Sequence, residues 1–511
     1  MINVLEMLEH SAERYPGDIA FSDPFGKITY SQLYYRARWV GTLFNAGVRT
    51  AKVNIGDGVA FFMEKSVDTL IAMFGAVYAG GFYSFIDVRQ PRDRVNSILT
   101  TLNPAVIITD SVNAPNLPEE YAPDGHRTIL MDELMELSQK TMTDDFALDN
   151  VRASFTDNMP LYVNFTSGST GVPKGVVVAH RSVIDFIGIF TRTFAITHND
   201  ILANQAPFDF DVSVKDIYSG LKMGAHVALI PREYFTNPTV LMDYLCEKKV
   251  TTLIWAVSAM CFVSIMNGFS YKTPGSIQKV MFSGEVMPVK QLNKWKAALP
   301  TAIFVNLYGP TEITCNCTYH ILDREYEKDD VIPIGIPFPN EKVFLLDEDD
   351  KEVTLTDVEG EICVSGTCLA LGYFKDPDKT KASFVQNPLN DKFTEIIYRT
   401  GDLGKYDNEG NLVYTSRKDF QIKHMGQRIE LGDIENTAMA VDGIERACCM
   451  YDHKHQKILL FVCTKLDKDA ITDALHVKLP PFMMPNKTII LNTFPLNKNG
   501  KIDRNALMEH A

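Results

Sequence analysis

The chain runs Leu161-Tyr-Val-Asn-Phe-Thr-Ser-Gly-Ser-Thr-Gly-Val-Pro-Lys174-Gly175 at the point that decides its fold. An alternating apolar run ends at Phe165 and a second apolar run begins at Val176, which predicts strand, glycine-rich loop, strand. The loop combines four hydroxyl residues with two glycines: Thr166, Ser167, Gly168, Ser169, Thr170 and Gly171. Glycine lets backbone N–H groups approach an anion, hydroxyls add donors, and a lysine adds a compact positive charge. We therefore expect a phosphate-binding loop; the alternative is a mobile Ser/Gly surface turn.

Two better-known motifs do not fit this loop. A Walker loop needs Gly directly before the lysine and Ser or Thr after it, whereas Pro173 precedes Lys174 and Gly175 follows. A nucleophile elbow needs Gly-x-Ser-x-Gly, and that pattern is centred on neither Ser167 nor Ser169. The loop is thus expected to bind phosphate without a Walker fold and without a serine nucleophile.

Composition sets broad limits. The 511 residues are 46% hydrophobic, enough for a packed core, and the net charge of −14 argues against a general nucleic-acid binder. The nine cysteines suit a reducing compartment, and they lack zinc-ligand spacing. The N-terminus has no signal-peptide pattern, and no apolar run approaches the length of a membrane span. We expect a cytoplasmic monomer that neither inserts into a membrane nor binds nucleic acid.

Alternating elements predict an α/β fold. Helical spacing over 3–15 is followed by a strand that turns into a helix at 28–33, with Ser31 as the expected N-cap. Strands over 59–62, 82–86 and 106–109 alternate with helices, which favours a parallel sheet buried on both faces. After residue 330 the strands shorten and turns crowd, which predicts a small β-rich subdomain. The charged segment at 416–420 is a candidate hinge before a last compact α/β domain.

Two charged residues lie among apolar neighbours in the stretch Phe208 to Tyr218. A helix is expected to start near Asp211, which would bring Asp211 and Lys215 onto one face as an i, i+4 pair. The simple interpretation is a solvated ion pair, or a helix N-cap for the aspartate. The apolar residues around them favour a pocket.

A second loop follows an apolar strand that begins at Ile303 and holds Tyr308, Gly309, Thr311 and Glu312. In open α/β sheets, ligands bind where strands end at their carboxyl edge. An aromatic ring can stack on a base, and a carboxylate can hold Mg²⁺ beside a triphosphate. The alternative is an ordinary Gly-Pro turn.

Together these stretches resemble, in order and over nearly the whole chain, the motif series of the adenylate-forming superfamily: acyl- and aryl-CoA ligases, luciferases and amino-acid adenylation domains. The matching blocks include Ile28–Leu33, Leu161–Gly175, Phe208–Tyr218, Asn306–Glu312, Gly360–Gly366, Tyr398–Leu403, Arg417–Glu435 and Asn499–Arg504. The resemblance implies a large N-terminal domain, 1–417, with parallel-sheet subdomains and a small β-rich subdomain. A small mobile α+β lid, 418–511, would follow it.

The resemblance also implies residue roles toward ATP and Mg²⁺. The loop residues Thr166 to Gly171 and Lys174 would bind the pyrophosphate end of ATP, Glu312 the Mg²⁺, and Asp419 would be the hinge. Lys501 would reach the substrate carboxylate and the developing phosphate charge, and Gly426 would line a channel for a pantetheine arm. The remaining nucleotide residues would be Asn306, Leu307, Tyr308, Gly309, Pro310, Thr311, Asp402, Tyr414 and Arg417.

Within the superfamily, Asp211 indicates an amino-acid substrate, because an aspartate at this position pairs with the α-amine. The whole chain looks most like stand-alone D-alanine–carrier protein ligases, and nonribosomal peptide synthetase adenylation domains are similar. Only ten residues follow Lys501, so a separate phosphopantetheinylated carrier protein is the expected partner. The amino-acid pocket would comprise Asp211, Val212, Lys215, Ile254, Met281, Ser283, Leu307, Cys315, Asn316 and Lys501.

Several positions depart from the D-alanine group. Ser283 stands where that group has a cysteine, Leu307 where the residue is usually smaller, and Lys215 where it is usually uncharged. A pocket that holds Lys215, Ser283 and Asn316 would suit a polar or acidic side chain. The expected function is ATP-dependent transfer of an amino acid to a carrier. The alternatives are a different stand-alone adenylation specificity, an acyl-CoA ligase, or a non-catalytic nucleotide sensor.

Overall fold

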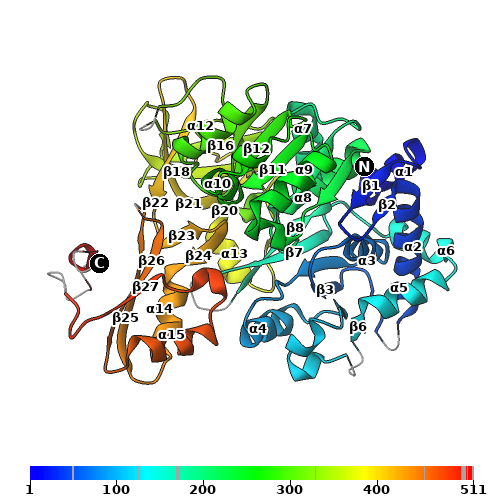
Figure 1. Ribbon diagram of the computed structural model, residues 1–511, viewed down its shortest axis with the longest axis horizontal. Coiled ribbons are helices and arrows are strands. Elements are labelled where there is room, and N and C mark those ends of the chain that lie inside the picture. The colour runs from blue at the N-terminus through cyan, green and yellow to red at the C-terminus, as the bar shows by residue number, and fades with distance from the viewer. Residues whose placement is uncertain are drawn as a thin grey trace.

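The computed structural model describes residues 1–48, 51–123, 127–168, 173–327, 330–453, 455–495, 502 and 504–508. Figure 1 shows four units along the chain: two parallel-sheet units, a β-rich unit, and a C-terminal unit of orange and red elements on the opposite side from the N-terminus. This is the α/β architecture expected from the alternating pattern, with the β-rich unit after residue 330. The boundary between residues 417 and 418 stays a prediction.

The larger sheet has the strand order β15-β14-β13-β12-β11-β9-β10-β1-β2. Its central strands β13, β12, β11, β9, β10 and β1 run parallel, and antiparallel strands close both edges. The bounds are β1 Ile19–Ser22, β2 Lys27–Thr29, β9 Ile201–Asn204, β10 His226–Leu229, β11 Thr252–Ala256, β12 Lys279–Ser283, β13 Ile303–Tyr308, β14 Thr318–Ile321 and β15 Ile336–Pro337. The carboxyl edge of this sheet carries the residues of the site.

A second sheet has the order β19-β8-β7-β4-β3-β5-β6. The bounds are β3 Gly58–Phe62, β4 Phe82–Phe85, β5 Val106–Thr109, β6 Thr128–Leu130, β7 Pro160–Thr166, β8 Lys174–Ala179 and β19 Gly372–Tyr373. Strands β7 and β8 pair antiparallel on either side of the glycine-rich loop, so the predicted strand–loop–strand is confirmed. Thr166 lies opposite Lys174 in this pairing, and the loop therefore starts and ends at two of the predicted phosphate contacts.

Helices pack on both faces of these sheets and join their cores. Their bounds are α1 Leu5–Arg14, α2 Tyr30–Ala46, α3 Val67–Tyr78, α4 Arg92–Leu102, α5 Met131–Gln139, α6 Asp145–Ala153, α7 His180–Thr193, α8 Val212–Met223, α9 Pro238–Glu247, α10 Val257–Ile265, α11 Gly268–Tyr271, α12 Val289–Ala298 and α13 Pro377–Ser383. Helix α3 is buried almost all round, as its uniformly apolar sequence dictates. One hydrophobic cluster contains residues of both sheets and of α1, α2, α3, α7 and α8.

The N-cap expected for the second helix was wrong by two residues. Helix α2 begins at Tyr30, and Thr29 caps it by accepting a hydrogen bond from the Gln32 amide. The Gln32 side chain accepts from the Thr29 amide in return, which completes a capping box. Ser31 lies inside the first turn, because Thr29 and Gln32 have the spacing that satisfies two free amide donors and Ser31 does not.

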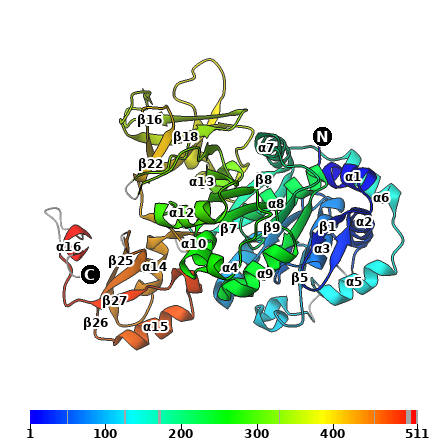
Figure 2. The ribbon, with the colours of Figure 1, turned by 45° about the horizontal axis from the view of Figure 1, so that its top comes forward.

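The β-rich unit is an antiparallel sheet of order β17-β16-β18-β21-β20, with β22 paired to β21. The bounds are β16 Glu341–Leu346, β17 Glu352–Val353, β18 Gly360–Gly366, β20 Phe384–Gln386, β21 Ile396–Tyr406 and β22 Leu412–Arg417. Figure 2 shows β16, β18 and β22 as a lobe set apart from the parallel sheets.

The C-terminal unit, which we call the lid, begins after β22 with a two-stranded hairpin and continues with a three-stranded sheet. Its bounds are β23 Gln421–His424, β24 Gln427–Glu430, α14 Leu431–Met439, β25 Ile444–Asp452, β26 Lys457–Thr464, α15 Lys468–His476, β27 Lys487–Ile490 and α16 Arg504–Met508. A separate hydrophobic cluster of residues 422–483 forms its core. In Figure 1 the β23–β24 hairpin lies on the side of the large domain, and Figure 2 shows α14 on that side and α16 at the outer end.

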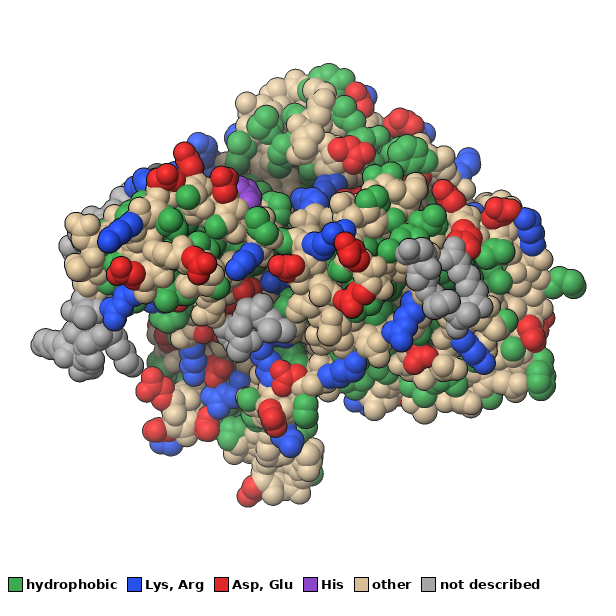
Figure 3. Space-filling view, turned by 90° about the horizontal axis from the view of Figure 1, so that it is seen from below, with side chains coloured by type: hydrophobic (Ala, Val, Ile, Leu, Met, Phe, Trp, Pro, Cys, Tyr) green, Lys and Arg blue, Asp and Glu red, His purple; other side chains and the backbone are tan. Residues whose placement is uncertain are grey.

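The surface agrees with the composition. On the face in Figure 3, acidic and basic side chains are interspersed, with no continuous basic field of the kind that binds nucleic acid. None of the described helices is long and apolar enough to span a bilayer. All nine cysteines are free thiols.

Candidate functional site

The phosphate loop ends beside a buried carboxylate. Lys174 Nζ, at the start of β8, lies 3.3 Å from Glu312 Oε1, and both side chains are buried. The Tyr373 hydroxyl donates to the same oxygen at 2.8 Å. Burial, then repulsion from Arg428, lowers the pKa of Lys174 to about 8. The glycine-rich loop and the Tyr308–Glu312 loop, far apart in sequence, therefore meet at one charged cluster.

The lid completes this cluster. Arg428, on β24, donates to Glu312 Oε2 at 2.7 Å. Burial opposes the charge of Glu312, but Arg428 and Lys174 outweigh it and hold the pKa of this carboxyl well below its usual range. The Ser167 hydroxyl donates to the Arg428 carbonyl at 2.7 Å and accepts from the Glu430 amide at 3.3 Å. The hairpin of the lid is thus hydrogen-bonded to the phosphate loop itself.

Residues Thr166, Ser167 and Gly168 are the part of the predicted phosphate loop that the structure describes. The Thr166 hydroxyl is buried and has no hydrogen-bond partner among the residues that the structure describes. Gly168 is buried next to Ser167. Ser169, Thr170, Gly171 and Lys501 lie outside the described residues. A buried hydroxyl without a partner costs free energy, and a phosphate oxygen would satisfy it.

A network of charges runs along the β21–β22 pair. Asp402 and Arg417 are register partners there, and the Arg417 guanidinium donates to Asp402. The Tyr308 hydroxyl donates to the other Asp402 oxygen at 2.5 Å. Arg417 also donates to both oxygens of Asp419, at 2.7 and 3.0 Å. Burial opposes the charge of Asp419, but the bonds from Arg417 outweigh it and lower its pKa. Two of the predicted nucleotide residues, Asp402 and Arg417, are therefore linked directly to the predicted hinge residue Asp419.

The other predicted nucleotide residues surround this network. Asn306, on β13, donates to the Pro333 carbonyl at 2.8 Å, and Tyr414 lies on β22. Gly309 has no room for a side chain, since a Cβ would lie 2.6 Å from the Asn316 Cα. Gly309, Pro310 and Thr311 line the same cavity as Asp402 and Arg417. The loop thus packs against the amino-acid side of the site.

Asp211 stands at the start of α8, and its side chain makes no capping hydrogen bond to that helix. Its carboxyl instead interacts with the Thr311 hydroxyl, while burial raises its pKa. The helix-cap interpretation of Asp211 is therefore not supported. Among the described residues this buried carboxylate forms no ion pair, and it therefore suits an incoming ammonium group.

Lys215 is fully buried, but it does not pair with Asp211 as expected. Its ammonium donates to Asn316 Oδ1 at 2.6 Å and to Ser283 Oγ at 3.3 Å. No ion pair joins Lys215 to any carboxylate in the described part of the chain. Spacing along α8 brings the two charges to one side of the helix, but Ser283 at the end of β12 and Asn316 in the loop before β14 supply closer partners for Lys215.

One cavity connects these groups. It is narrow, about 40 Å³, in this arrangement of the lid. Its walls combine predicted amino-acid-binding residues, predicted nucleotide-binding residues and residues of the lid: Phe210, Asp211, Val212, Ser283, Gly284, Gly309, Pro310, Thr311, Cys315, Asn316, Asp402, Arg417, Lys423, Gly426 and Arg428. The predicted pocket residues Ile254, Met281 and Leu307 do not line it; they are buried in the core beside it, in the same cluster as Cys315.

The lid hairpin forms one wall of this cavity. Met425 and Gly426 form its turn, both with positive φ, 53° and 77°. The Gly426 amide donates to Glu285 Oε1 at 3.0 Å, and a Cβ on Gly426 would lie 3.4 Å from Ser258 Oγ. A Cβ at Gly426 would therefore make only ordinary contacts with this part of the large domain, and glycine is favoured at this position by its positive φ.

Sequence reasoning assigned no role to four residues that the structure brings into the site: Tyr373, Lys423, Arg428 and Glu285. Lys423 lines the cavity, with its ammonium 5.7 Å from the centre of the Tyr308 ring. Burial lowers the pKa of Lys423, although Asp402 and Asp211 favour its charged form. Two of these residues, Lys423 and Arg428, are cations within the matched block 417–435. The two are direct partners across the β23–β24 hairpin, and a cation in each of these two short strands was the available signal.

The donor set can accommodate one magnesium ion together with phosphate. Mg²⁺ in nucleotide sites is held by one or two carboxylates plus substrate phosphates. Glu312 is such a carboxylate, and the unpartnered Thr166 hydroxyl lies at the end of the strand opposite Lys174. No cluster of three or more metal-ligating side chains occurs among the described residues, so Glu312 would hold the ion only with a nucleotide.

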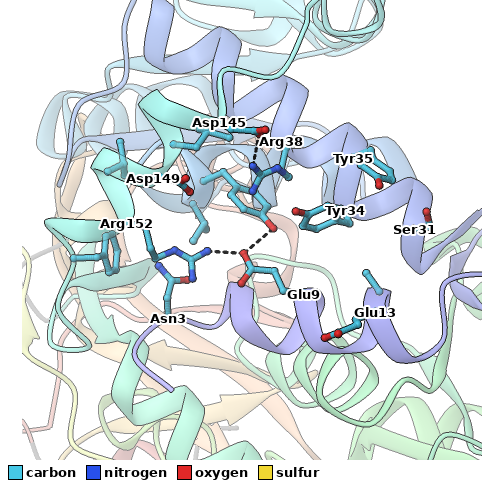
Figure 4. A pocket seen from close by; sticks show the side chains of 16 residues that line it. Asn3, Glu9, Glu13, Ser31, Tyr34, Tyr35, Arg38, Asp145, Asp149 and Arg152 are labelled. Carbon is cyan, nitrogen blue, oxygen red and sulfur yellow. Dashed lines mark hydrogen bonds and ion pairs between the residues drawn. The ribbon is translucent and has the colours of Figure 1, made fainter.

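A larger cavity, about 630 Å³, lies away from these groups, among α1, α2, α3 and α6. Figure 4 shows its charged walls, with Arg152 reaching toward Glu9 and Arg38 toward Asp145. None of the predicted site residues lines it, and its charged pairs are already matched within the wall. Size alone therefore does not identify the site.

Comparison with known proteins agrees with this geometry. The family described as AMP-binding enzyme matches residues 8–374. The L-proline–[L-prolyl-carrier protein] ligase of Streptomyces coelicolor is 30% identical, over 94% of this chain and 91% of that protein. Tyrocidine synthase 1 of Brevibacillus parabrevis is 28% identical over 99% of this chain but only 45% of its own length.

Several other curated relatives are longer still, and the chain spans 8% of tyrocidine synthase 3. Among solved structures, holo-PA1221, an NRPS protein containing adenylation and PCP domains, superposes with a TM-score of 0.83. It is 24% identical, with 99% of this chain and 84% of that chain covered, and therefore supports the fold alone.

Proposed function

Since the chain belongs to the AMP-binding enzyme family, within the adenylate-forming superfamily, we propose that it activates an amino acid as aminoacyl-AMP and passes it to a phosphopantetheine thiol. The observation that carries this proposal is the single cavity in which Asp211, Arg417 and Gly426 meet. These are an amine-binding group, a nucleotide-binding group and a turn of the lid. The similarity to a prolyl-carrier protein ligase supports a separate carrier protein as the acceptor.

The chemistry needs no covalent link to the protein. In the first half-reaction a carboxylate oxygen of the amino acid attacks the α-phosphorus of ATP, and the bond to the β-phosphate breaks, so that pyrophosphate leaves with the electron pair. In the second, the thiol sulfur attacks the acyl carbon, AMP leaves, and the thiol proton is released. The protein would supply positioning and charge stabilisation. Mg²⁺, when bound with ATP, would neutralise charge on the phosphates.

Each group of residues has a part in this scheme. Asp211 would hold the α-amine, Asp402 and Arg417 the ribose, and Lys174 with the Thr166 hydroxyl the phosphates. Lys501 would stabilise charge in the first half-reaction. We assign the lid arrangement described above to the second half-reaction, because Gly426 packs against α10 at the cavity and Arg428 occupies the Glu312 carboxylate.

The lid would then rotate about Asp419 between half-reactions. Its bonds to Arg417 tie the proposed hinge directly to the nucleotide site. The large domain would comprise residues 1–417 and the lid residues 418–511. We infer a monomer in the cytoplasm, where ATP is plentiful and nine free thiols remain reduced.

Three other functions would make different demands on the site. The acid substrate of an acyl-CoA ligase has no α-amine to bind the buried Asp211 carboxylate. A nucleotide sensor would not need the hydrogen bonds that join the lid to Glu312. A D-alanine–carrier protein ligase fits the fold, but the methyl side chain of its substrate would offer no acceptor to Ser283 and Asn316 and no opposite charge to Lys215.

Amino-acid-dependent ATP–pyrophosphate exchange over the twenty L-amino acids and D-alanine tests the proposal. We expect exchange with at least one amino acid and none with fatty or aryl acids. Asp211→Asn should abolish most of it, and Asp243→Asn, at a half-exposed carboxylate on α9 that pairs with Lys272, is the matched control. Exchange that depends on a non-amino carboxylic acid, or no exchange with any acid, would refute the proposal.

A further inference from the structure

The amino-acid side of the cavity ends at a buried positive charge. Lys215 is fully buried on α8, behind Ser283 and Asn316, which line the cavity. Both of its hydrogen-bond partners are neutral, and no carboxylate forms an ion pair with it among the described residues. The next carboxylate on the helix, Asp216, accepts from Asn204 at 2.9 Å instead. A buried ammonium without a counter-ion is unfavourable unless a ligand supplies one.

Lys215 also determines which hydrogen-bonding groups the cavity wall presents to a ligand. An ammonium only donates hydrogen bonds, so the Asn316 oxygen must face Lys215 and the Asn316 amide N–H groups must point elsewhere. The Ser283 oxygen likewise accepts from Lys215, which leaves the Ser283 O–H free to donate. Since both residues line the cavity, its wall presents hydrogen-bond donors backed by a positive charge.

The loop that carries Asn316 is held in a strained shape. Thr314 and Cys315 have φ values of 56° and 77°, a left-handed conformation that β-branched Thr314 rarely adopts. The Thr314 hydroxyl donates to the Cys368 carbonyl at 2.7 Å, and Cys315 Sγ donates to the Asp211 carbonyl at 3.2 Å. These bonds fix Asn316 relative to Asp211, so the negative and positive ends of the pocket keep a set separation.

We propose that the substrate is an α-amino acid with a carboxylate in its side chain, such as aspartate or glutamate. This inference rests on the proposed function and names the substrate class of that site. The α-amine binds Asp211, and the side-chain carboxylate accepts from Asn316 and Ser283 while Lys215 neutralises it from behind. Each buried charge then has an opposite charge across the pocket.

Other side chains satisfy the wall less completely. An apolar side chain such as that of alanine leaves the two donors and the Lys215 charge unpaired in a dry pocket. An amide side chain offers one acceptor, but it brings donors of its own toward Asn316 and Ser283. A carboxylate is acceptor-only and charged, and therefore matches the wall at every contact.

The test is ATP–pyrophosphate exchange, measured as kcat/KM for aspartate, glutamate, asparagine, glutamine, serine and alanine in both chiralities. The wild type is expected to prefer an acidic amino acid over alanine by about 30-fold or more, the usual effect of one buried charged partner. Lys215→Met should erase this preference, and Lys222→Met, on the same helix but partly exposed, should retain it.

A second variant keeps the lysine in place. Asn316→Asp gives Lys215 a permanent counter-ion and removes the amide donors, so it should lose acidic substrates by a similar factor while alanine changes little. A wild type that prefers alanine or an apolar amino acid would overturn the inference and leave the proposed function standing. Equal loss for all substrates in both variants would overturn it too. Exchange with no amino acid would refute the proposed function itself.

Discussion

Arg428 is expected to act mainly in the second half-reaction, and Arg428→Ala tests this. Its guanidinium donates to Glu312 Oε2 at 2.7 Å, and Glu312 is completely buried. Removing one partner of a buried pair typically costs about 3–5 kcal/mol. Here Lys174 at 3.3 Å and Tyr373 at 2.8 Å continue to hold Glu312, so we expect about 2 kcal/mol, the lower end for charged pairs.

That free energy would be lost only in the lid arrangement in which Arg428 reaches Glu312. The population of this lid arrangement should fall by roughly 30-fold, and the rate of thiol transfer should fall by the same factor. Transfer can be measured from pre-formed aminoacyl-AMP to pantetheine, and adenylation by pyrophosphate exchange. Exchange should stay within about 3-fold of wild type, because Glu312 keeps its other contacts.

The matched control is Arg446→Ala, an exposed arginine on β25 of the lid, which should change neither step. If Arg428→Ala lowered exchange and transfer equally, Arg428 would serve both half-reactions or the fold in general. If transfer were unaffected, the contact with Glu312 would not stabilise the arrangement that transfers the acyl group.

Other predictions follow from single residues. Asp211→Ala should raise the KM for the amino acid about 30-fold or more and leave the KM for ATP little changed, as steady-state kinetics with each substrate varied would show; a normal amino-acid KM would contradict the role of Asp211. Because the pKa of Lys174 is lowered to about 8, its ammonium loses its charge above that pH. The KM for ATP should therefore be constant below about pH 8 and rise above it, and Lys174→Arg should remove this rise. Lys501→Ala should slow adenylation by about 10²-fold or more and spare transfer from pre-formed aminoacyl-AMP, whereas equal loss would argue against a rotating lid. Burial lowers the pKa of His180 from 6.5 to about 3, so between these two pH values only the unfolded state takes the proton. Lowering the pH from 7.5 to 5.5 should therefore reduce the free energy of unfolding by about 1.4 kcal/mol. His180→Phe should not show this loss, and urea unfolding of both proteins at both pH values measures it.

The helices and strands of the fold can be predicted from the sequence more completely than the contacts between site residues. The strand–loop–strand at Leu161–Val178 and the helix at Asp211 follow from local periodicity and glycine placement, and the structure has both. Motif order supports residues such as Glu312 and Asp402. Glu312 follows β13 at the carboxyl edge of the parallel sheet, as expected for a ligand site, whereas Asp402 lies within β21 of the antiparallel sheet and reaches the site through the Tyr308 hydroxyl.

Contacts between distant segments were not predictable in the same way. Lys215 was expected to pair with Asp211, because a sequence shows which residues share a face of one helix but not which distant segments come into contact. Its actual partners are Ser283, at the end of β12, and Asn316, in the loop before β14, which lie 68 and 101 residues away in the sequence. Arg428 reaches Glu312 across 116 residues, and only the docking of the lid brings the two together.

The most direct test of the central claim follows one oxygen atom. The amino acid that drives pyrophosphate exchange is labelled with ¹⁸O in its α-carboxylate and incubated with ATP and pantetheine in unlabelled water. If the carboxylate attacks the α-phosphorus, thiolysis of the acyl bond leaves one ¹⁸O on AMP, detectable by mass spectrometry. AMP without label, or label in inorganic phosphate, would contradict the formation of aminoacyl-AMP at this site.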